Sequence, residues 1–318
     1  MMMLGGRSKS LGTTFLALWR NNNCCNHSVS SSALFLSAAN SIRFQHSYSL
    51  EVLPQTAAKL ESIETKNFLP SRVYIAHLET TPIQDMVQTA AFLRERIGIK
   101  EIMPHVPARL VQDRAMLRDW IRRYKESANV DQFLLIAGSS KTPFGAFENS
   151  LELIETGLFD ECSRIHFAAH PQGNGLSWED EIDNLRAKQA VLSDMKIPNV
   201  ALVTQFAFDS KDIIDWTVKI QGEGIELPVH VGVAGPTSVS SLMKYARICG
   251  VQPSATFLQR RGLTDISNLV SYDPLELVKD LKKFRDENNS SSMEQIHFFP
   301  FGGVEATMDF ARKHAQLF

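Results

Sequence analysis

Short runs of apolar residues alternate along the chain with longer segments whose apolar residues recur at helical spacing. Asn199–Asp209 shows this pattern most clearly. Its apolar start suits a strand buried on both faces, and polar Thr204 and Gln205 follow where that strand should end. The same pattern predicts further strands over Tyr48–Leu53, Arg72–Leu78, Lys100–Val106, Asp131–Gly138, Arg164–Ala169, Leu227–Val233 and Gln295–Phe299.

Helical spacing and capping residues predict a helix after most of these strands. In the first, Thr81 suits the N-cap, Pro82 the first turn and Gly98 the end. The expected helices cover Thr81–Ile97, Leu110–Ser127, Phe147–Gly157, Trp178–Leu192, Ser210–Gly222, Thr237–Cys249, Asp273–Asn288 and Val304–Gln316. Strands and helices therefore alternate, as they do in chains built from βα units.

This alternation predicts an α/β fold, and we expect a single-domain (β/α)8 TIM barrel over residues 47–318. About 250 residues is the usual size of such a barrel. An open, doubly wound sheet would use the same alternation. No Gly-x-Gly-x-x-Gly turn follows the first strand, however, and this absence weighs against a dinucleotide-binding sheet of the Rossmann type.

The composition limits the kinds of partner to expect. A formal net charge of −2 over 318 residues gives no basic excess for binding nucleic acid, and no apolar run is long enough to cross a bilayer. None of the four cysteines has metal-ligand spacing. We therefore expect a small-molecule ligand and no nucleic acid, membrane or metal; a homo-oligomer stays open.

The N-terminal segment has a different composition from the rest of the chain. It contains Arg7, Lys9, Arg20 and Arg43, is rich in Ser and Asn, and has no acidic residue before Glu51. Such a composition is typical of an organelle transit peptide. We expect residues 1–46 to be a leader for mitochondrial import, with plastid import as the alternative; an extension of a cytoplasmic protein with no targeting role also stays open.

The carboxyl ends of the strands in a barrel meet at one mouth, where TIM-barrel enzymes bind their ligands. The amide of Gln205 offers two donor hydrogens and one acceptor, which suits the edge of a heterocycle. Alternatively, Thr204 and Gln205 form hydrogen bonds to a neighbouring loop. Gly232 and Gly235 would let a flat ligand approach the backbone. Other residues expected at this mouth are Glu51, His77, His105, Ser139, Ser140, His170, Phe301 and Gly302.

Glu51 is the candidate catalytic residue at this mouth. Its neighbours Leu50 and Val52 are apolar, and burial among apolar groups would raise its pKa and make it a general acid. The alternative is a structural ion pair inside the mouth. The histidines could be bases or metal ligands, although neutral, hydrogen-bonding histidines are more common than either.

Five short motifs, in order around the expected barrel, resemble those of methylenetetrahydrofolate reductases. Thr204–Asp209 (Thr-Gln-Phe-Ala-Phe-Asp) is similar to that family's Thr-Gln-Phe-Phe-Phe-Asp. The others are Leu50–Pro54, Pro104–Val106, Ala169–Pro171 and Val231–Pro236. The resemblance extends from about Ser49 to Gly250, and it is closest to the short, single-domain bacterial branch.

The resemblance implies a flavoprotein in which NAD(P)H reduces FAD and the flavin passes hydride to 5,10-methylenetetrahydrofolate, giving 5-methyltetrahydrofolate. Glu51 would be the acid that opens the methylene bridge, and Gln205, with Thr204, would bind the pterin. The residues implied at the flavin are His105, Ser139, Ser140, His170, Glu181, Asn184 and Lys188. From the residues alone, the helix that carries the last three is an ordinary charged, exposed helix.

The chain departs from this family at several positions. The family's aspartate after strand 4 falls in Gly138-Ser139-Ser140, its flavin-stacking tyrosine is His170, and its nicotinamide-stacking aromatic is Val239. An arginine used for the folate tail falls at Gly303, and Arg109 or Arg260 is a candidate replacement. Two alternatives therefore stay open: a barrel that binds folate or flavin without reductase turnover, and a flavin-dependent one-carbon enzyme with another electron donor.

Overall fold

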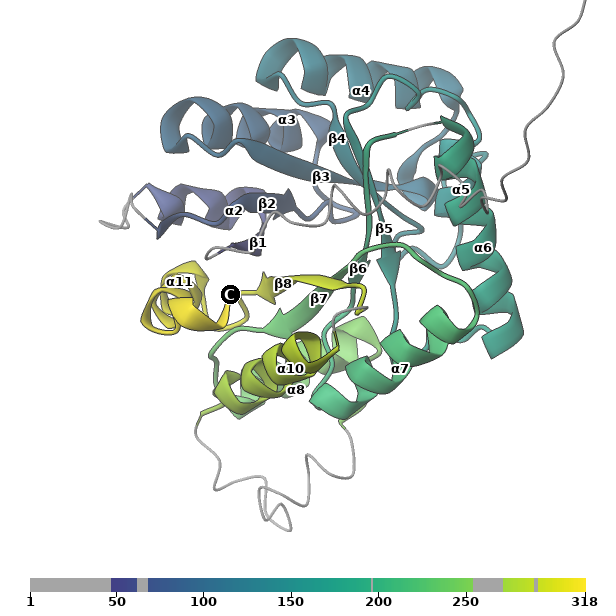
Figure 1. The fold of residues 1–318 in the computed structure, drawn as a ribbon. Helices are drawn as coiled ribbons and strands as arrows, with labels where there is room; N and C mark the ends of the chain where they lie inside the picture. The colour runs from purple at the N-terminus through teal and green to yellow at the C-terminus, as the bar shows by residue number, and fades with distance from the viewer. Residues whose placement is uncertain (1–46, 62–67, 196, 254–270, 289–290) are drawn as a thin grey trace, which may run out of the picture. The chain divides into compact units, whose positions relative to one another are not determined.

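The computed structural model describes residues 47–61, 68–195, 197–253, 271–288 and 291–318. Its strands form a closed parallel barrel in chain order, which confirms the predicted (β/α)8 fold and excludes the open sheet (Figure 1). The expected leader, residues 1–46, lies outside the described residues, as does Arg260. The strands are β1 (Tyr48–Val52), β2 (Arg72–Ile75), β3 (Glu101–Pro107), β4 (Gln132–Ile136), β5 (Arg164–Ala169), β6 (Asn199–Thr204), β7 (Val229–Ala234) and β8 (Met293–Phe299).

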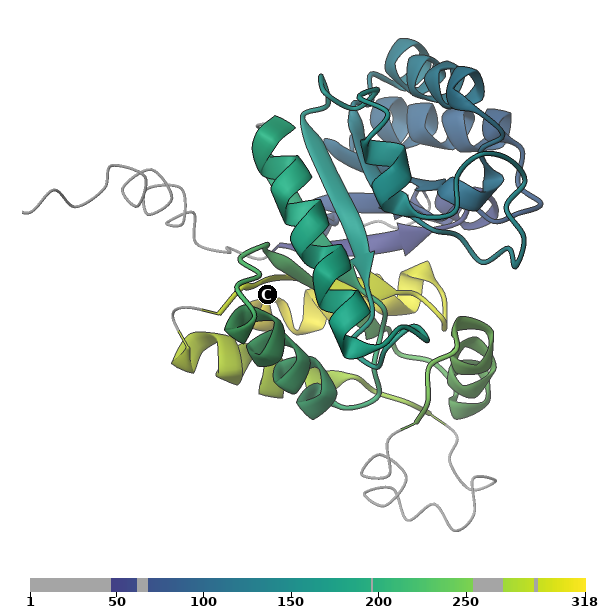
Figure 2. The ribbon, with the colours of Figure 1, turned by 90° about the vertical axis from the view of Figure 1, so that its right-hand side faces the viewer.

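The helices pack around the outside of this barrel, as the two views in Figures 1 and 2 show. Leu93–Ile97 continues α3 as a π-helical turn, and Gly98 ends it with a φ of 87°, a conformation that glycine adopts without strain. The helices are α2 (Pro54–Ala57), α3 (Ile83–Phe92), α4 (Arg114–Ala128), α5 (Ser150–Ile154), α6 (Trp178–Met195), α7 (Ser210–Gly222), α8 (Val239–Cys249), α10 (Leu275–Glu287) and α11 (Val304–Lys313).

Several element boundaries differ from the prediction because capping side chains decide where helices begin. Asp113 accepts a hydrogen bond from the backbone N–H of Met116, so α4 begins at Arg114 rather than near Leu110. Asn149 likewise caps α5, which begins at Ser150. The short α2, which starts at Pro54, was not predicted at all.

Along each strand, side chains point alternately outward to the helices and inward to the barrel interior. The outward residues, among them Leu50, Val73 and Phe298, belong to the large hydrophobic core between strands and helices. A small apolar cluster of Tyr74, Met103, Leu134 and Val203 forms separately. His166, His230 and His297 are also almost completely buried, and ring contacts join each of them to Tyr74 or to one another. The barrel interior is therefore partly polar.

Arg72 lies at the centre of the hydrogen-bonded network at the amino ends of the strands. Its guanidinium donates to Glu101 (2.6 Å), to Gln295 (2.8 Å) and to Nδ1 of His230 (3.0 Å). Arg164 donates to the second carboxylate oxygen of Glu101 at 2.8 Å. These charge-assisted bonds close the end of the barrel opposite the mouth and pair the buried arginine with a carboxylate.

Candidate active site

Glu51 comes from β1 and lies at the carboxyl end of the barrel, where it faces two imidazole rings. Its Oε2 is 3.4 Å from Nε2 of His105 and 3.9 Å from Nε2 of His297. In the described part of the chain, neither nitrogen has a hydrogen-bond partner, although both are buried. Buried polar atoms are normally paired, so these two nitrogens and the carboxylate mark a place for a polar group of a ligand or for water.

The charge state of Glu51 differs from the sequence-based expectation. Burial acts to raise its pKa, but the imidazoles of His297 and His105 outweigh burial, and the pKa of Glu51 lies below that of an ordinary glutamate. The expected rise in pKa was therefore wrong. Leu50 and Val52, on which the expectation rested, point out of the barrel because neighbours in a strand face opposite sides. Glu51 is therefore a carboxylate at neutral pH. This charge state is nearer to the alternative of a structural ion pair than to a protonated general acid.

His297 is held in position by β1. Its Nδ1 lies 3.1 Å from Oγ of Ser49, the residue that pairs with it in the strand register. Burial lowers the pKa of His105 to about 4 and leaves its ring neutral at physiological pH. His297 was not predicted as a site residue from the sequence. The signal was present in β8, where Gln295 and His297 alternate with apolar Ile296 and Phe298.

Gln205 directly follows β6 at the mouth and is half-buried. Its side-chain Oε1 accepts a hydrogen bond from the backbone N–H of Phe206 at 3.0 Å. An N–H can only donate, so this contact identifies the oxygen of the amide and leaves the Nε2 hydrogens for a ligand. The Gln205 oxygen thus already accepts one hydrogen bond, whereas no described residue accepts one from its Nε2.

Thr204 is buried, and its hydroxyl accepts a hydrogen bond from the backbone N–H of Gly232 at 2.8 Å. This hydrogen bond joins β6 to β7. It is similar to the alternative given for Thr204, a hydrogen bond to neighbouring protein rather than to a ligand. Gly232 itself has no room for a side chain, because a Cβ there would lie 2.2 Å from the carbonyl oxygen of Thr204 and 2.8 Å from Phe299. A Cβ on Gly235 would lie 2.3 Å from Thr307. The space at both glycines is filled by protein, which contradicts the expectation that they admit a ligand.

His170 and three residues of α6 make up a second group of predicted site residues. Burial first, and then the nearby charge of Lys188, lower the pKa of His170 to about 4. Lys188 is buried, with its Nζ 5.1 Å from the centre of the Phe167 ring, and burial lowers its pKa to about 8. Within the described residues, this ammonium forms no ion pair or hydrogen bond, whereas an exposed lysine was expected.

Glu181 and Asn184 lie on α6 at spacings that turn them toward the same side as Lys188. Glu181 accepts a hydrogen bond from the indole N–H of Trp216 on α7 at 3.2 Å, and burial raises its pKa. Asn184 is half-buried. One side of α6 therefore carries an acid, an amide and a buried lysine.

Ser139 and Ser140 lie in the loop after β4. Ser139 is exposed, while the hydroxyl of Ser140 donates to the carbonyl of Thr142 at 2.8 Å. Arg109 holds this loop in place by donating to the carbonyl oxygens of Ser140 and Glu148, both at 3.0 Å. Arg109 thus has a structural task, which weighs against its use for a folate tail.

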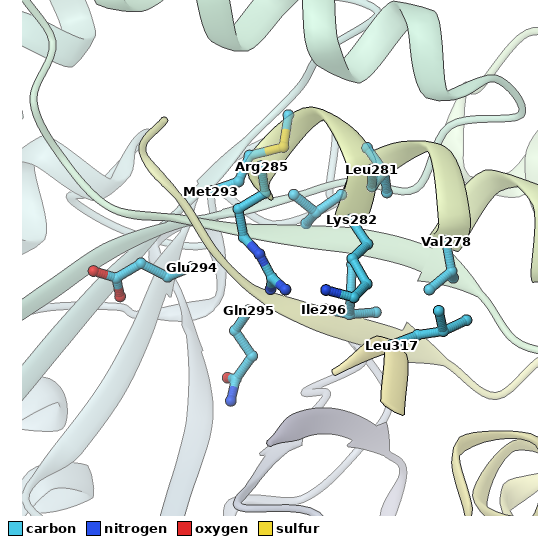
Figure 3. A pocket seen from close by; sticks show the side chains of 10 residues that line it. Val278, Leu281, Lys282, Arg285, Met293, Glu294, Gln295, Ile296 and Leu317 are labelled. Carbon is cyan, nitrogen blue, oxygen red and sulfur yellow. The ribbon is translucent and has the colours of Figure 1, made fainter. Parts of the chain in front are cut away.

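Two of the hollows in the described structure are lined by residues other than Glu51, His105, His297 and Gln205. The first holds only about 10 Å³, room for roughly one water, and it lies between α10 and β8 (Figure 3). The second, about 540 Å³, lies beside Trp178 of α6 and Trp216 of α7, next to Glu181. The described residues contain no group of three His, Cys, Asp or Glu side chains suited to a metal ion, and no described helix is long and apolar enough to cross a membrane.

No protein-family model matches the chain. A protein from Clostridium thermocellum, solved with two copies of bound 5-methyl-5,6,7,8-tetrahydrofolic acid, is similar in structure: the TM-score is 0.52 at 13% identity, over 90% of this chain and 99% of that one. At this identity the likeness shows a shared fold. A 2,3-dimethylmalate lyase (TM-score 0.46, 11% identity, 90% and 86% covered) and the Yersinia pestis dihydropteroate synthase (0.40, 12%, 84% and 91%) are too distant to carry an argument.

Proposed function

We propose that the chain is a folate-binding barrel enzyme that reduces a one-carbon unit, in the manner of methylenetetrahydrofolate reductases. The observation that carries this proposal is the placing of two groups at the same mouth of a closed barrel: the Glu51 carboxylate, and the amide donors of Gln205, which bind no residue in the described part of the chain. The structural neighbour that binds 5-methyltetrahydrofolate adds support. The motifs around the mouth agree with the same ligand.

In this proposal Glu51 supplies the proton that opens the methylene bridge. The carboxylate is ionised in the ligand-free chain, so it must first take up a proton from solvent. A bound folate would exclude water from the mouth, and this further desolvation raises the pKa of a carboxyl group. The proton on Glu51 then passes to the amine nitrogen that leaves the one-carbon carbon. Gln205 fixes the ring by donating to an acceptor on its edge.

The side chains on α6 fit an anionic nucleotide cofactor such as FAD. A buried ammonium without an anionic partner is costly, and a diphosphate would provide that partner. Lys188 is buried and forms no ion pair with a described residue, although the charge of Glu181 acts to raise its pKa; Asn184 and His170 lie nearby to donate hydrogen bonds. The exposed hydroxyl of Ser139 would add a further donor, and Ser140 lies beside it with its own hydroxyl already bonded to Thr142. Bound FAD would supply the hydride chemistry, and NAD(P)H is the proposed electron donor.

We place the enzyme in the mitochondrion on the composition of its first 46 residues. A homo-oligomer stays open.

The experiment that tests the function is an absorbance spectrum of the purified full chain, followed by anaerobic addition of NADH and then methylenetetrahydrofolate. A flavin band that bleaches with NADH and returns with folate would support the reductase. A chain that binds 5-methyltetrahydrofolate but no flavin would keep the folate part and overturn the FAD part. A chain that binds neither would overturn the proposal.

A second candidate is a barrel that binds folate or flavin without this turnover, or that uses another electron donor. The observation that favours it is the loop after β4, where Ser139 and Ser140 provide no negative charge to stabilise a cationic intermediate. In the same experiment, a flavin band that NADH fails to bleach would favour this candidate.

A further inference from the structure

The two ring nitrogens of His297 face a hydroxyl on one side and a carboxylate on the other. Nδ1 lies 3.1 Å from Oγ of Ser49, and Nε2 lies 3.9 Å from Oε2 of Glu51. The ring is 1% exposed and packs edge-on against Tyr74 at 4.6 Å and Phe299 at 4.8 Å between ring centres. These contacts fix the direction in which each nitrogen points.

The hydroxyl of Ser49 indicates that Nδ1 of His297 carries a proton. Ser49 donates to the carbonyl oxygen of Ile296 in a long hydrogen bond of 3.5 Å. A hydroxyl has a single hydrogen, so its oxygen then accepts a hydrogen bond from Nδ1–H of His297.

The surroundings of Nε2 indicate that a second proton lies there. This nitrogen is buried, and no described residue forms a hydrogen bond with it. A bare Nε2 would turn its lone pair toward the negative charge of Glu51, which is repulsive. A protonated Nε2 makes the ring an imidazolium and gives an attractive charge pair with the carboxylate. The geometry therefore favours the charged ring.

His105, the other imidazole beside Glu51, is not suited to hold this proton. Burial lowers the pKa of His105 to about 4; the carboxylate of Glu51 opposes this effect, and the charge of His297 adds to it. Burial also lowers the pKa of His77, which lies close to His105. His297 thus differs from both in keeping its proton at the mouth.

The other titratable groups around Glu51 and His297 do not exchange protons near neutral pH. Burial raises the pKa of Tyr74 to about 12 and that of Cys249 to about 11, so both stay protonated. Burial first, and then nearby charges, hold the pKa of two further histidines well below the usual value, so their rings stay neutral; they are His166 and His230. Among the described groups, one proton is therefore left for Glu51 and His297 to share.

A ligand that covers the mouth would change which of the two partners holds this proton. Exclusion of water disfavours the charged form of every group, so it raises the pKa of a carboxyl group and weakens the hold of an imidazole on its proton. Both effects act in the same direction here. The imidazolium and carboxylate would become a neutral imidazole and a carboxylic acid.

We propose that His297 is a positioning residue that holds a proton for Glu51 before the ligand binds. When a ligand covers the mouth, the N–H bond at Nε2 breaks and an O–H bond forms at Oε2, which leaves the imidazole neutral with its proton on Nδ1. Glu51 then gives this proton to the ligand. Once the mouth opens again, His297 takes up another proton from solvent through Glu51. The inference rests on the proposed function for the ligand, and it adds the place where the proton waits.

Nitrogen NMR of the full chain with 15N-labelled histidine tests this inference, because the 15N shifts show which ring nitrogens carry protons. The signals of His297 are those lost in His297→Gln. At pH 7 we expect both nitrogens protonated in the ligand-free wild-type chain and a neutral ring in Glu51→Gln. Saturation with 5-methyltetrahydrofolate should remove the proton from Nε2 in the wild-type chain. His314→Gln, at the end of α11, is the control and should leave these signals unchanged.

Calorimetry in buffers of different ionisation enthalpy counts the protons taken up when 5-methyltetrahydrofolate binds. The wild-type chain should take up no net proton at pH 7.5, because the transfer is internal. His297→Gln has no proton to give, so Glu51 should draw about one from solvent. A merely structural role of His297 would change the affinity and leave this count as it is. The thermal midpoint of the variant checks that it folds.

The outcomes separate this inference from the proposed function. A neutral His297 in the ligand-free wild-type chain would overturn the inference, whatever the chain binds. A ring that stays protonated with folate bound, or an equal proton count in His297→Gln, would overturn it while the folate function stands. If the chain binds no folate, the proposed function fails, and the ligand-free spectra of the wild-type and Glu51→Gln chains decide whether His297 holds the proton.

Discussion

Oε2 of Glu51 lies 3.4 Å from Nε2 of His105, yet no hydrogen bond joins them. The neutral imidazole and the carboxylate thus lie close together without forming a hydrogen bond. A ligand atom or a water between them would complete both. This unfilled pairing distinguishes Glu51 from Glu101, whose two carboxylate oxygens are both bound by arginines.

Replacing Glu51 by Gln should leave cofactor content unchanged and lower folate-dependent flavin reoxidation by a factor of about 10² to 10⁴, the usual effect of removing a general acid. Stopped-flow absorbance would measure the reoxidation rate. Glu305→Gln, on the exposed face of α11, is the matched control. Undiminished reoxidation in the Glu51 variant would remove Glu51 from the mechanism.

Replacing Gln205 by Glu should weaken folate binding more than replacing it by Ala. The glutamate keeps an oxygen for the N–H of Phe206 but brings a negative charge where the ligand presents an acceptor. We expect a loss of about 10-fold or more for Gln205→Ala, since a ligand acceptor left unpaired costs roughly 1–3 kcal/mol. Calorimetric titration would check this order, and equal affinity for the Glu variant would show that the ligand donates here.

The buried histidines should make the fold sensitive to acid. Burial first, and then neighbouring charges such as Arg72, hold the pKa of His166 and His230 well below 6.5. Below about pH 6.5 the unfolded chain therefore binds protons that the folded chain does not. The free energy of unfolding should fall by about 1.4 kcal/mol per pH unit for each histidine as pH decreases through this range, and neither should contribute above it.

Urea unfolding at pH 7.5 and 5.5 would measure this effect. The variant His166→Gln should show a shallower pH dependence than the wild-type chain, because it removes one such proton. An unchanged slope would mean that His166 titrates alike in both states.

Replacing Arg72 by Ala should destabilise the barrel strongly. The change removes the guanidinium that donates to Gln295 and His230. It also removes one of the two arginines on Glu101, and breaking a buried pair typically costs about 3–5 kcal/mol. Arg122→Ala, which breaks only exposed pairs on α4, should have a far smaller effect. Similar unfolding free energies for the two variants would contradict the structural importance of Arg72.

The sequence predicted the fold well because each element carries its own signal. Arg164–Ala169 and Ser210–Gly222 begin and end where apolar runs and helical spacing indicate, so these bounds are confirmed. Alternation alone suits an open sheet as well as a closed barrel, and the size of the chain and the absence of a Gly-x-Gly-x-x-Gly turn favoured the barrel. The helix ends at α4 and α5 were less predictable, since they depend on which of several polar side chains turns to cap the backbone.

The candidate site was harder to predict because its chemistry depends on neighbours far apart in the chain. Leu50 and Val52 say little about the surroundings of Glu51, which are set instead by His105 and His297 on β3 and β8. Lys188 looks like a surface charge in the sequence, and only the packing of α6 on Phe167 shows that it is buried. The local sequence pattern predicts which face of a strand or helix a side chain lies on. Its protonation state depends on tertiary contacts that the local pattern does not contain.

The pairing of β1 with β8 also has a consequence for synthesis of the chain. Ser49 and His297 are 248 positions apart, so a ribosome must translate all of the chain between them before Glu51 can meet the imidazole anchored beside it. Contacts this distant in sequence form late in folding. A nascent or truncated chain that lacks β8 would therefore carry an incomplete mouth, and ligand binding would report that the last strand had joined the first.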